Sequence, residues 1–316
     1  MEKTTGRDAR ERHVRESEEL LARAFEENRP RLLRVAYTMT GSLAEAEDCV
    51  QEAWLRLRGL DDPGTVRDLA AWLTTTVSRL ALDALSSARA RREHYVGTWL
   101  PEPLVEARSY APAAPYAPAD PADRVTLDES VSMALLVVLE QLSPAERTAF
   151  VLHDVFSVPF PEIAEVVGRS PAAVRQLASR GRRRVEDGRP RTPATEAEQR
   201  ELAEAFMAAC HKGDLPGLVA LLDPDAVLRG DGGGKVITAP RPVLTAARIA
   251  SLMLDRLRAA GTLDIRVAAV NGAPGLVVRD EHGGLSVLAL TVDAGRITAI
   301  DLMRNPDKLA RVPDLD

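Results

Sequence analysis

A run of arginines with one glutamine, between Pro171 and Val185, is the part of this 316-residue chain best suited to bind nucleic acid. Over residues 171–192 seven arginines are opposed by only two acidic residues, although the whole chain carries a net charge of −6. A guanidinium can bind a guanine edge through two hydrogen bonds, a glutamine amide can bind adenine, and further arginines can neutralise phosphates. At helical spacing one face carries the residues that we expect to contact DNA: Ser170, Arg175, Gln176, Ser179, Arg180 and Arg183.

The elements around this face predict a helix-turn-helix. Ser143-Pro144-Ala145-Glu146 has the pattern of a capping box with proline at the first helical position. A short helix should then end at Gly168, and Ser170 should cap a third helix that reaches about Arg184. A short helix, a glycine turn and a capped basic helix are typical of DNA-binding proteins. The alternative is a helical hairpin with a solvated arginine face. The inward set of the third helix is Val174, Leu177, Ala178, Gly181 and Val185.

Two longer helices are predicted in the N-terminal part. Ser42 to Glu45 form a second capping box, followed by apolar residues at helical spacing. The opposite stripe of that helix is either a solvated face, with an i,i+4 pair between Glu52 and Arg56, or a docking face for a basic partner. The next helix should span residues 67–92, and its basic end suits the helix dipole and a DNA backbone equally well.

Proline-rich and glycine-rich segments divide the chain into blocks. Residues 101–123 are rich in proline and alanine, and a second break falls at residues 188–193. We expect an N-terminal helical domain over 14–93, a linker over 94–127, a second helical domain over 128–187 and a third domain over 195–316. No apolar run is long enough to span a membrane, and the two cysteines lack metal-ligand spacing. These features predict a cytoplasmic protein with no metal site and no cofactor.

The order of these elements resembles the extracytoplasmic-function sigma factors of bacterial RNA polymerase. Residues 44–58, AEAEDCVQEAWLRLR, resemble the helix of region 2 that grips the largest polymerase subunit. Residues 70–92 resemble the helix that faces the −10 promoter element, and residues 142–185 resemble region 4, which binds the −35 element. The resemblance implies that core polymerase and promoter DNA are the partners. It also implies that the loop over residues 58–68 walls a pocket for a flipped −10 base.

The resemblance also assigns candidate residues to each surface. By carry-over, Asp48, Gln51, Glu52 and Arg56 are the expected contacts with core polymerase. The expected −10 contacts are Arg67, Trp72, Arg79, Arg89, Arg91 and Arg92.

The third block predicts helices followed by an antiparallel sheet. Helices are expected over residues 195–211, 215–222 and 241–257, and strands over 262–270, 275–279, 285–291 and 296–303. The block resembles a SnoaL-like domain of the cone-shaped nuclear-transport-factor-2-like fold. The expected fold class is therefore two all-α sigma domains plus one α+β domain.

Relatives of that fold include isomerases, for which Asp231, Asp264, Asp301 and His211 are available here. Because the block contains neither Tyr nor Trp, we expect no catalysis.

Three short segments resemble a subgroup of sigma factors that carries this extension. They are YVGTWLPEPL over 95–104, DGGGKV over 231–236 and NPDKL over 305–309. The resemblance implies that the extension replaces a separate anti-sigma factor and holds the two sigma domains compact. The sequence leaves open whether the C-terminal domain binds an unidentified small ligand. The expected regulatory residues are Trp99, Pro101, Asp231, Gly232, Gly233, Gly234, Lys235, Asn305, Pro306, Asp307 and Lys308.

Two alternatives to a sigma factor remain at this stage. One is a one-component regulator with a helix-turn-helix and a ligand-sensing domain, which has no reason to carry the first helical block. The other is a SnoaL-type enzyme fused to a DNA-binding module, which predicts turnover that depends on Asp231 or Asp301.

Overall fold

The structure is a computed structural model that describes residues 2–92, 95–109 and 131–314. The first helical block contains α1 (Glu2–Thr40), α2 (Leu43–Arg58), a short 3-10 turn (Pro63–Thr65) and α3 (Leu69–Arg92). Both helices that the apolar spacing predicts, α2 and α3, are present. The capping box at α2 is only half confirmed. The Ser42 hydroxyl accepts the Glu45 N–H, but the Ser42 N–H donates to Thr40 Oγ1 at 3.3 Å.

The second helical block contains the predicted helix-turn-helix. Its elements are α4 (Met133–Leu139), α5 (Pro144–Phe150) with a π-helical turn (Val151–Val155), α6 (Phe160–Val167) and α7 (Pro171–Gly188). The reciprocal capping box at Ser143 is confirmed. Gly168 ends α6 at φ +68°, and Ser170 caps α7. All five predicted inward residues of α7 are buried. The helix runs past Arg184 to Gly188 because the next helix-breaking residue, Pro190, forces Arg189 into an extended conformation.

The C-terminal domain packs three longer helices against a sheet that has seven strands in the described part of the chain. The helices are α8 (Glu196–Lys212), α9 (Leu215–Leu221) and α10 (Ala246–Ala259). The four predicted strands are confirmed as β4 (Leu263–Val270), β5 (Ala273–Asp280), β6 (Leu285–Asp293) and β7 (Arg296–Met303). The helix expected from Arg241 begins only at Ala246, because Pro240 and Pro242 disfavour helix and residues 243–244 form a strand instead.

Three further strands were not predicted. They are β1 (Val105–Ser109), β2 (Leu222–Asp231) and β3 (Val243–Leu244), and the sheet order is β1-β4-β5-β6-β7-β2-β3. The first of them belongs to the linker, where Val105 pairs with Val270 of β4. The linker, expected to lack lasting regular structure, therefore contributes an edge strand to the sheet of the C-terminal domain.

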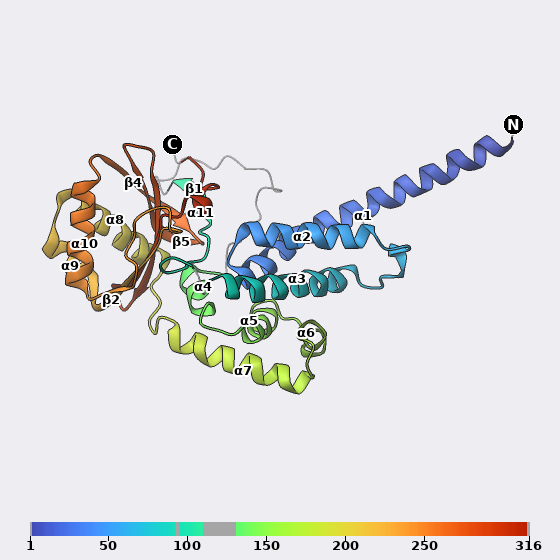
Figure 1. The fold of residues 1–316 in the computed structure, drawn as a ribbon, viewed down its shortest axis with the longest axis horizontal. Helices are drawn as coiled ribbons and strands as arrows, with labels where there is room; N and C mark the ends of the chain where they lie inside the picture. The colour runs from blue at the N-terminus through green and yellow to red at the C-terminus, as the bar shows by residue number, and fades with distance from the viewer. Residues whose placement is uncertain (1, 93–94, 110–130, 315–316) are drawn as a thin grey trace.

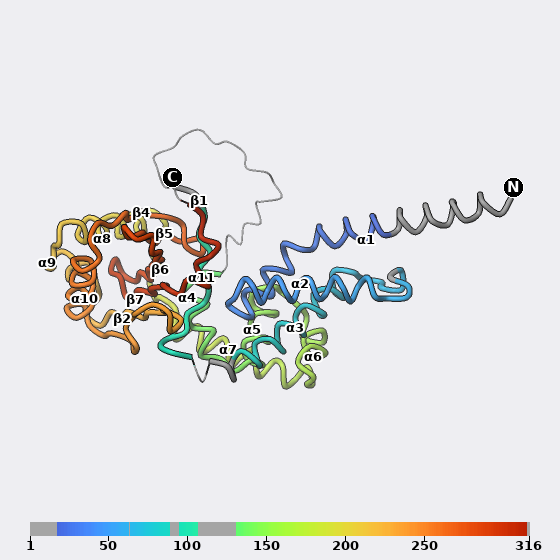
Figure 2. The backbone as a smooth tube through the Cα atoms, turned by 45° about the horizontal axis from the view of Figure 1, so that its top comes forward, coloured from blue at the N-terminus to red at the C-terminus, as the bar shows by residue number. Residues whose placement is uncertain are grey.

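The two faces of this sheet have different coverings. Figures 1 and 2 show α8, α9 and α10 on one face, while α4, β1 and the short helix α11 (Pro306–Leu309) lie toward the helical blocks. The helix-covered face encloses an apolar core that includes Phe206, Leu218 and Ile249. On the opposite face a second core joins sheet residues such as Val287 to Leu100 of the linker and Met133 of α4. The C-terminal domain thus shares a core with the rest of the chain.

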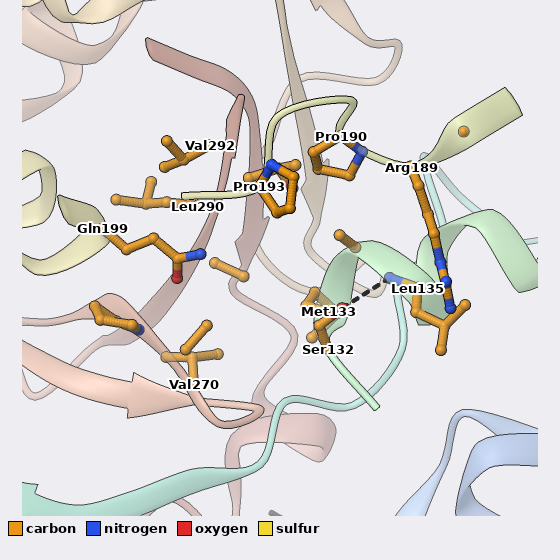
Figure 3. Close-up of a pocket in the computed structure, with 16 residues that line it drawn as sticks. Ser132, Met133, Leu135, Arg189, Pro190, Pro193, Gln199, Val270, Leu290 and Val292 are labelled. Atoms are coloured by element: carbon orange, nitrogen blue, oxygen red, sulfur yellow. Dashed lines mark hydrogen bonds between the residues drawn. The ribbon is translucent and has the colours of Figure 1, made fainter. Parts of the chain in front are cut away.

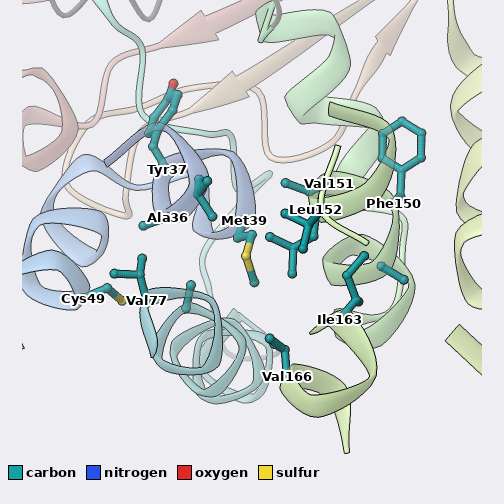
Figure 4. Close-up of a cluster of buried hydrophobic side chains, with 14 of the residues drawn as sticks. Ala36, Tyr37, Met39, Cys49, Val77, Phe150, Val151, Leu152, Ile163 and Val166 are labelled. Carbon is teal, nitrogen blue, oxygen red and sulfur yellow. The ribbon is translucent and has the colours of Figure 1, made fainter. Parts of the chain in front are cut away.

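The two helical blocks also share one core. Figure 4 shows Met39 of α1 and Val77 of α3 on one side and Leu152 and Ile163 of the second block on the other. Polar contacts reinforce this packing. The buried Arg147 side chain donates from Nη2 to the carbonyl of Thr38 at 3.0 Å and forms an ion pair with Glu140. The chain is therefore compact, with all three units in contact.

Candidate nucleic-acid interface and interdomain contacts

The outward face of α7 carries the expected DNA-binding residues. Arg175, Gln176, Arg180 and Arg183 are exposed, Ser179 is half-buried, and Ser170 lies at the start of the helix. Figure 1 shows α7 along the edge of the molecule, with its amino end at the turn that follows α6. The helix is rigid because its cap and its buried side are both satisfied. This arrangement can place a basic helix into a DNA groove.

Several arginines of α7 hold the helix in place as well. Arg182 donates from Nε to Asp154 Oδ1 at 2.7 Å, and Arg184 Nη1 lies 3.0 Å from Glu146 Oε2. Burial would raise the pKa of Glu146, but hydrogen bonds from Ser143 and the charges of Arg184 and Arg180 lower it overall. The carboxylate therefore stays ionised beside the recognition helix. The surface available to DNA is smaller than the number of arginines indicates.

The residues expected to bind core polymerase lie together on α2. Asp48, Gln51 and Arg56 are exposed, and Glu52 pairs with Arg56 at 2.9 Å. Sequence reasoning missed Leu55, whose side chain is 52 % exposed between them. Leu55 lies outside the apolar stripe of α2, and that offset was the available signal. A single exposed leucine is common on protein surfaces, so Leu55 is notable only because it lies within the face that the resemblance assigns to polymerase binding.

The same helix contacts the C-terminal tail. Glu47 accepts a hydrogen bond from Arg311 Nη2 at 2.6 Å, just beyond α11. Neither residue was singled out from the sequence, because they lie at opposite ends of the chain. The tail therefore lies beside the helix that the resemblance assigns to polymerase binding.

The expected −10 residues follow α3 and the loop before it. Arg67 is exposed, and Trp72 is half-buried and packs against the shared core. Arg79 is turned toward the second helical block, where its Nη2 donates to the carbonyl of Glu165 in α6 at 3.1 Å. Arg89, Arg91 and Arg92 fall on α3, but their side chains lie outside the described residues.

The expected regulatory residues meet around one buried carboxylate. Asp231 accepts hydrogen bonds from the Tyr95 hydroxyl at 2.6 Å and from the Leu100 N–H at 2.9 Å. Its Oδ2 also forms an ion pair with Lys308 Nζ at 2.8 Å, and its side chain is fully buried. Burial, followed by the hydrogen bond to Asp231, raises the pKa of Tyr95, so the phenol remains a donor. Three separate segments therefore converge on Asp231.

The lysine at this contact also touches the linker. Lys308 Nζ lies 3.9 Å from the ring centroid of Trp99 and hydrogen-bonds the carbonyl of Leu100, next to the buried Pro101. An ammonium group that lies over the face of an indole ring, with little of it exposed to solvent, forms a favourable cation–π interaction. Pro306 begins α11, which positions the lysine. Together with the Asp231 contacts, these interactions define what we call the Asp231 clamp: Tyr95, Trp99, Leu100, Asp231, Asn305 and Lys308.

Glycines shape the loop of the clamp. A side chain at Gly232 would lie 1.9 Å from the carbonyl oxygen of Val236. Gly233 has φ +64° and packs against Asn305, whose amide donates to the Tyr95 hydroxyl at 3.0 Å. Gly234 also has a positive φ and lies beside Val96 of the linker. At the rim, Lys235 pairs with Asp307 at 2.7 Å, and both are exposed.

A second contact, which sequence reasoning missed, joins the first helical block, the linker and the C-terminal domain. The buried Tyr37 hydroxyl donates to the carbonyl of Glu102 at 2.8 Å and accepts from Asn271 Nδ2 at 2.7 Å. The carboxylate of Glu102 accepts the Leu43 N–H at the start of α2 at 2.8 Å. Asn271 also exchanges two hydrogen bonds with Leu104. We call this group the Tyr37 node: Tyr37, Leu43, Glu102, Leu104 and Asn271.

The four residues considered for catalysis are not brought together. Asp301 pairs with Arg229 at 2.6 Å on the sheet face that also carries Asp231, opposite the helix-covered core. Burial raises the pKa of Asp301, against the opposing charge of Arg229. Asp264 pairs with Arg266 at the surface, and His211 is exposed near the end of α8. The core between the sheet and its covering helices consists of apolar side chains.

Two negative findings apply to the described residues alone. Within residues 2–92, 95–109 and 131–314 there is no group of acidic, histidine or cysteine side chains that could hold a metal ion. None of the helices in that part of the chain is long and apolar enough to cross a membrane.

Comparison with known proteins adds to this geometry. The family described as Sigma-70 region 2 matches residues 24–91, and Sigma-70, region 4 matches residues 132–185. The chain is 43% identical over 302 residues to the ECF RNA polymerase sigma factor SigJ of Mycobacterium tuberculosis, covering 92% of this chain and 93% of the relative. It is 37% identical over 287 residues to the probable ECF RNA polymerase sigma factor SigI of the same species, covering 90% and 93%. The crystal structure of the M. tuberculosis SigJ protein superposes with a TM-score of 0.73 at 39% identity, covering 92% of this chain and 99% of that one.

Proposed function

Because this chain belongs to the extracytoplasmic-function RNA polymerase sigma factors and directs transcription initiation at promoters, we propose that its C-terminal domain controls this activity in cis. The family expected from the sequence is confirmed, and so is the fold class of two helical sigma domains with an α+β SnoaL-like domain. The first block matches region 2, which a one-component regulator has no reason to carry, so this match argues against that alternative. The protein works with RNA polymerase in the cytoplasm.

We assign the surfaces of the sigma domains as follows. The α2 face with Asp48, Gln51, Glu52 and Arg56, now joined by Leu55, binds core polymerase. Residues of α3 and the loop before it contact the −10 element. The outward face of α7 contacts the −35 element, where arginine forks and Gln176 suit base edges and phosphates. The exposure of the α2 and α7 faces supports these assignments.

The observation that carries the proposal is the Asp231 clamp. A fully buried carboxylate of the C-terminal domain is held by the linker backbone at Leu100, by Tyr95 and by Lys308. Each of the two hydrogen bonds from the linker, from Tyr95 and from the Leu100 N–H, goes to this buried charge and contributes roughly 1.5–3 kcal/mol. The linker between the two sigma domains is therefore bound tightly to the C-terminal domain. No separate anti-sigma factor is needed for such control.

The compact arrangement conflicts with simultaneous use of both promoter elements. The two sigma domains share a core, and Arg79 of the −10 helix is bonded to Glu165 of the helix-turn-helix. Spreading them along a promoter requires that these contacts break, so the balance between compact and extended forms sets the activity. The clamp lowers the free energy of the compact form and so reduces the population of the extended form.

In vitro transcription with core polymerase tests the proposal. Asp231→Asn keeps the shape of the side chain but removes the charge that pairs with Lys308. Asp264→Asn removes an exposed carboxylate that pairs with Arg266 on β4, and it serves as the matched control. We expect promoter-directed transcript to rise by about 5- to 150-fold at limiting polymerase, the range of a coupling free energy of 1–3 kcal/mol. The control should stay within twofold of the unaltered protein.

A distance measurement shows whether Asp231→Asn acts by letting the two sigma domains move apart. Spin labels at Asp61 and Arg169, both exposed, report the separation of the two sigma domains. The labelled Asp231→Asn protein should show a longer and broader distance distribution than the labelled Asp264→Asn protein. Unchanged distances together with unchanged transcription would refute control in cis.

A further inference from the structure

A cavity of about 320 Å³ lies between the helix-turn-helix domain and the sheet of the C-terminal domain. Figure 3 shows its walls: α4 at Ser132–Leu135, the connecting segment at Arg189–Pro193, and strand β6 at Leu290 and Val292. It does not include any residue of the Asp231 clamp, and it borders the helix-covered core of the sheet at Leu290 and Val292. Small-molecule sites favour such junctions between domains and begin at about this volume.

The cavity opens where two strands separate. Strand β5 pairs with β6 only over Leu276–Arg279 and Leu285–Leu288, whereas β6 continues along β7 to Asp293. Four consecutive residues of β6, Ala289 to Val292, therefore line the cavity on the side that β5 has left. Successive side chains of a strand alternate between faces, so a run of four shows that main chain forms this wall. Across the gap, β5 contributes Ala273 and Pro274, and proline has no N–H to offer.

The connecting segment over 189–193 is held firmly above the cavity. Asp293 accepts the N–H groups of Arg191 at 3.1 Å and Thr192 at 2.7 Å, and Pro193 bridges to Asp293. The hydrogen bonds from Thr192 and then Arg191 lower the pKa of Asp293, so the anchor persists near neutral pH. Two prolines restrict the segment further. The cavity is thus a preformed space with a fixed roof.

We infer that this cavity binds a small, flat and mostly apolar molecule that carries an N–H and a C=O side by side. The lining is largely aliphatic, which suits an apolar body. The β6 main chain between Ala289 and Val292 offers donors and acceptors in the pattern that a neighbouring strand would use. Gln199 points into the cavity from α8 and adds a polar group at one end. The volume admits roughly 10–20 non-hydrogen atoms.

The location gives the ligand a regulatory consequence. One wall belongs to the −35-binding domain and the other to the C-terminal domain, so the complete site exists only in the compact form. A ligand that binds one form alone shifts the equilibrium toward it. This consequence rests on the proposed function, whereas the binding itself does not.

Binding of 2-quinolinone to the full-length protein tests the site. This probe is flat and carries the lactam N–H and C=O, whereas N-methyl-2-quinolinone has the same body without the donor. Titration followed by calorimetry should show saturable binding of one 2-quinolinone per chain. The N-methyl compound should bind about tenfold more weakly, as expected for one lost hydrogen bond and the clash of its methyl group.

Substitutions that fill the cavity test whether the probe binds there. Ala134→Leu fills it from the α4 wall and Ala273→Leu from the β5 wall, while Ala259→Leu adds the same side chain on the exposed end of α10. Each filling variant should weaken binding at least tenfold, and the control should match the unaltered protein. Thermal unfolding identifies any variant that fails to fold, and the other filling variant then decides.

Two results would overturn the inference: no saturable binding by the unaltered protein, or equal binding by both filling variants and the control. The outcome is separable from that of the proposed function. If Asp231→Asn leaves transcription and distances unchanged while the filling variants still abolish binding, control by the clamp fails and the site stands.

Discussion

Asn271 and Tyr37 lie 234 positions apart in the sequence, yet the Asn271 amide donates to the Tyr37 hydroxyl across 2.7 Å. The contact joins the β4–β5 turn of the C-terminal domain to the end of α1 in sigma region 2. Burial raises the pKa of Tyr37, so its hydroxyl is protonated and donates to Glu102. We therefore regard the Tyr37 node as a second tie between regulator and sigma domains, independent of the Asp231 clamp.

Tyr37→Phe should lower the free energy of unfolding by about 1–3 kcal/mol. The change removes one hydroxyl and leaves a buried carbonyl at Glu102 and a buried amide at Asn271 without that partner. Urea unfolding followed by circular dichroism measures the loss.

A double-mutant cycle with Asn271→Gly isolates the contact itself. Glycine tolerates the φ of +50° at this position, so the backbone is not strained. We expect a coupling free energy of about 0.5–3 kcal/mol between the two changes. Strictly additive effects would mean that the contact contributes nothing to stability.

The Glu102→Gln variant should loosen the start of α2. The Glu102 carboxylate accepts the Leu43 N–H at 2.8 Å, which satisfies one of the first N–H groups of the helix with a negative charge. Loss of that charge should speed hydrogen exchange at Leu43 by about fivefold, since such caps contribute roughly 1 kcal/mol. Exchange measured by NMR should remain unchanged at the start of α7, where Ser170 is the cap.

Much of the fold followed from local sequence signals. Capping residues, apolar spacing and Gly168 predicted α5, α6 and α7, and turn residues predicted β4 to β7. The three short segments expected to be regulatory were also identified from the sequence, and residues of all three lie together in the Asp231 clamp. These features depend on residues within a few positions of one another, or on a resemblance that covers the whole chain.

The features that were missed depend on long-range contacts. At α2 the capping box was expected to use Glu45, but the Ser42 N–H donates to Thr40, and Glu102 of the linker accepts the next N–H of the helix, that of Leu43. The linker strand β1 pairs with β4 only because the C-terminal domain folds beside it. The sheet is covered on both faces, and apolar residues of β7 lie on both of them, so alternation alone does not tell which face Asp301 occupies. Neither local propensity nor periodicity holds that information.

Arg183→Ala and Arg182→Ala, adjacent on α7, should have opposite consequences. Arg183 is exposed on the proposed DNA face, whereas Arg182 pairs with Asp154 at 2.7 Å. Arg183→Ala should weaken binding of the holoenzyme to a transcribed promoter by about tenfold and reduce its salt dependence by about one counterion. It should leave the thermal midpoint unchanged.

Arg182→Ala should instead lower stability by less than about 1 kcal/mol, because its pair is partly exposed, and should affect promoter binding less. Fluorescence anisotropy at several salt concentrations and thermal unfolding of both variants provide the comparison. Equal loss of promoter binding in the two variants would contradict the assignment of the α7 face.

Asp301 should make the unaltered protein less stable as the pH rises from acid toward neutral. Burial raises the pKa of Asp301 in the folded protein above its ordinary value of 3.8, and Arg229 offsets this only in part. A carboxyl group with a raised folded pKa binds its proton more tightly in the folded state. Its contribution to stability is therefore complete below pH 3.8 and is lost as the pH climbs through the folded pKa.

Asp301→Asn should remove this dependence, since an amide does not titrate. Urea unfolding between pH 4 and pH 8 should give a difference in stability, variant minus unaltered protein, that increases with pH. Asp264→Asn is the control, because Asp264 is an exposed partner of Arg266 in the same sheet. Its difference from the unaltered protein should stay flat over the same range. A flat difference for Asp301→Asn as well would show that the Asp301 carboxylate is stabilised by Arg229 as fully as water would stabilise it.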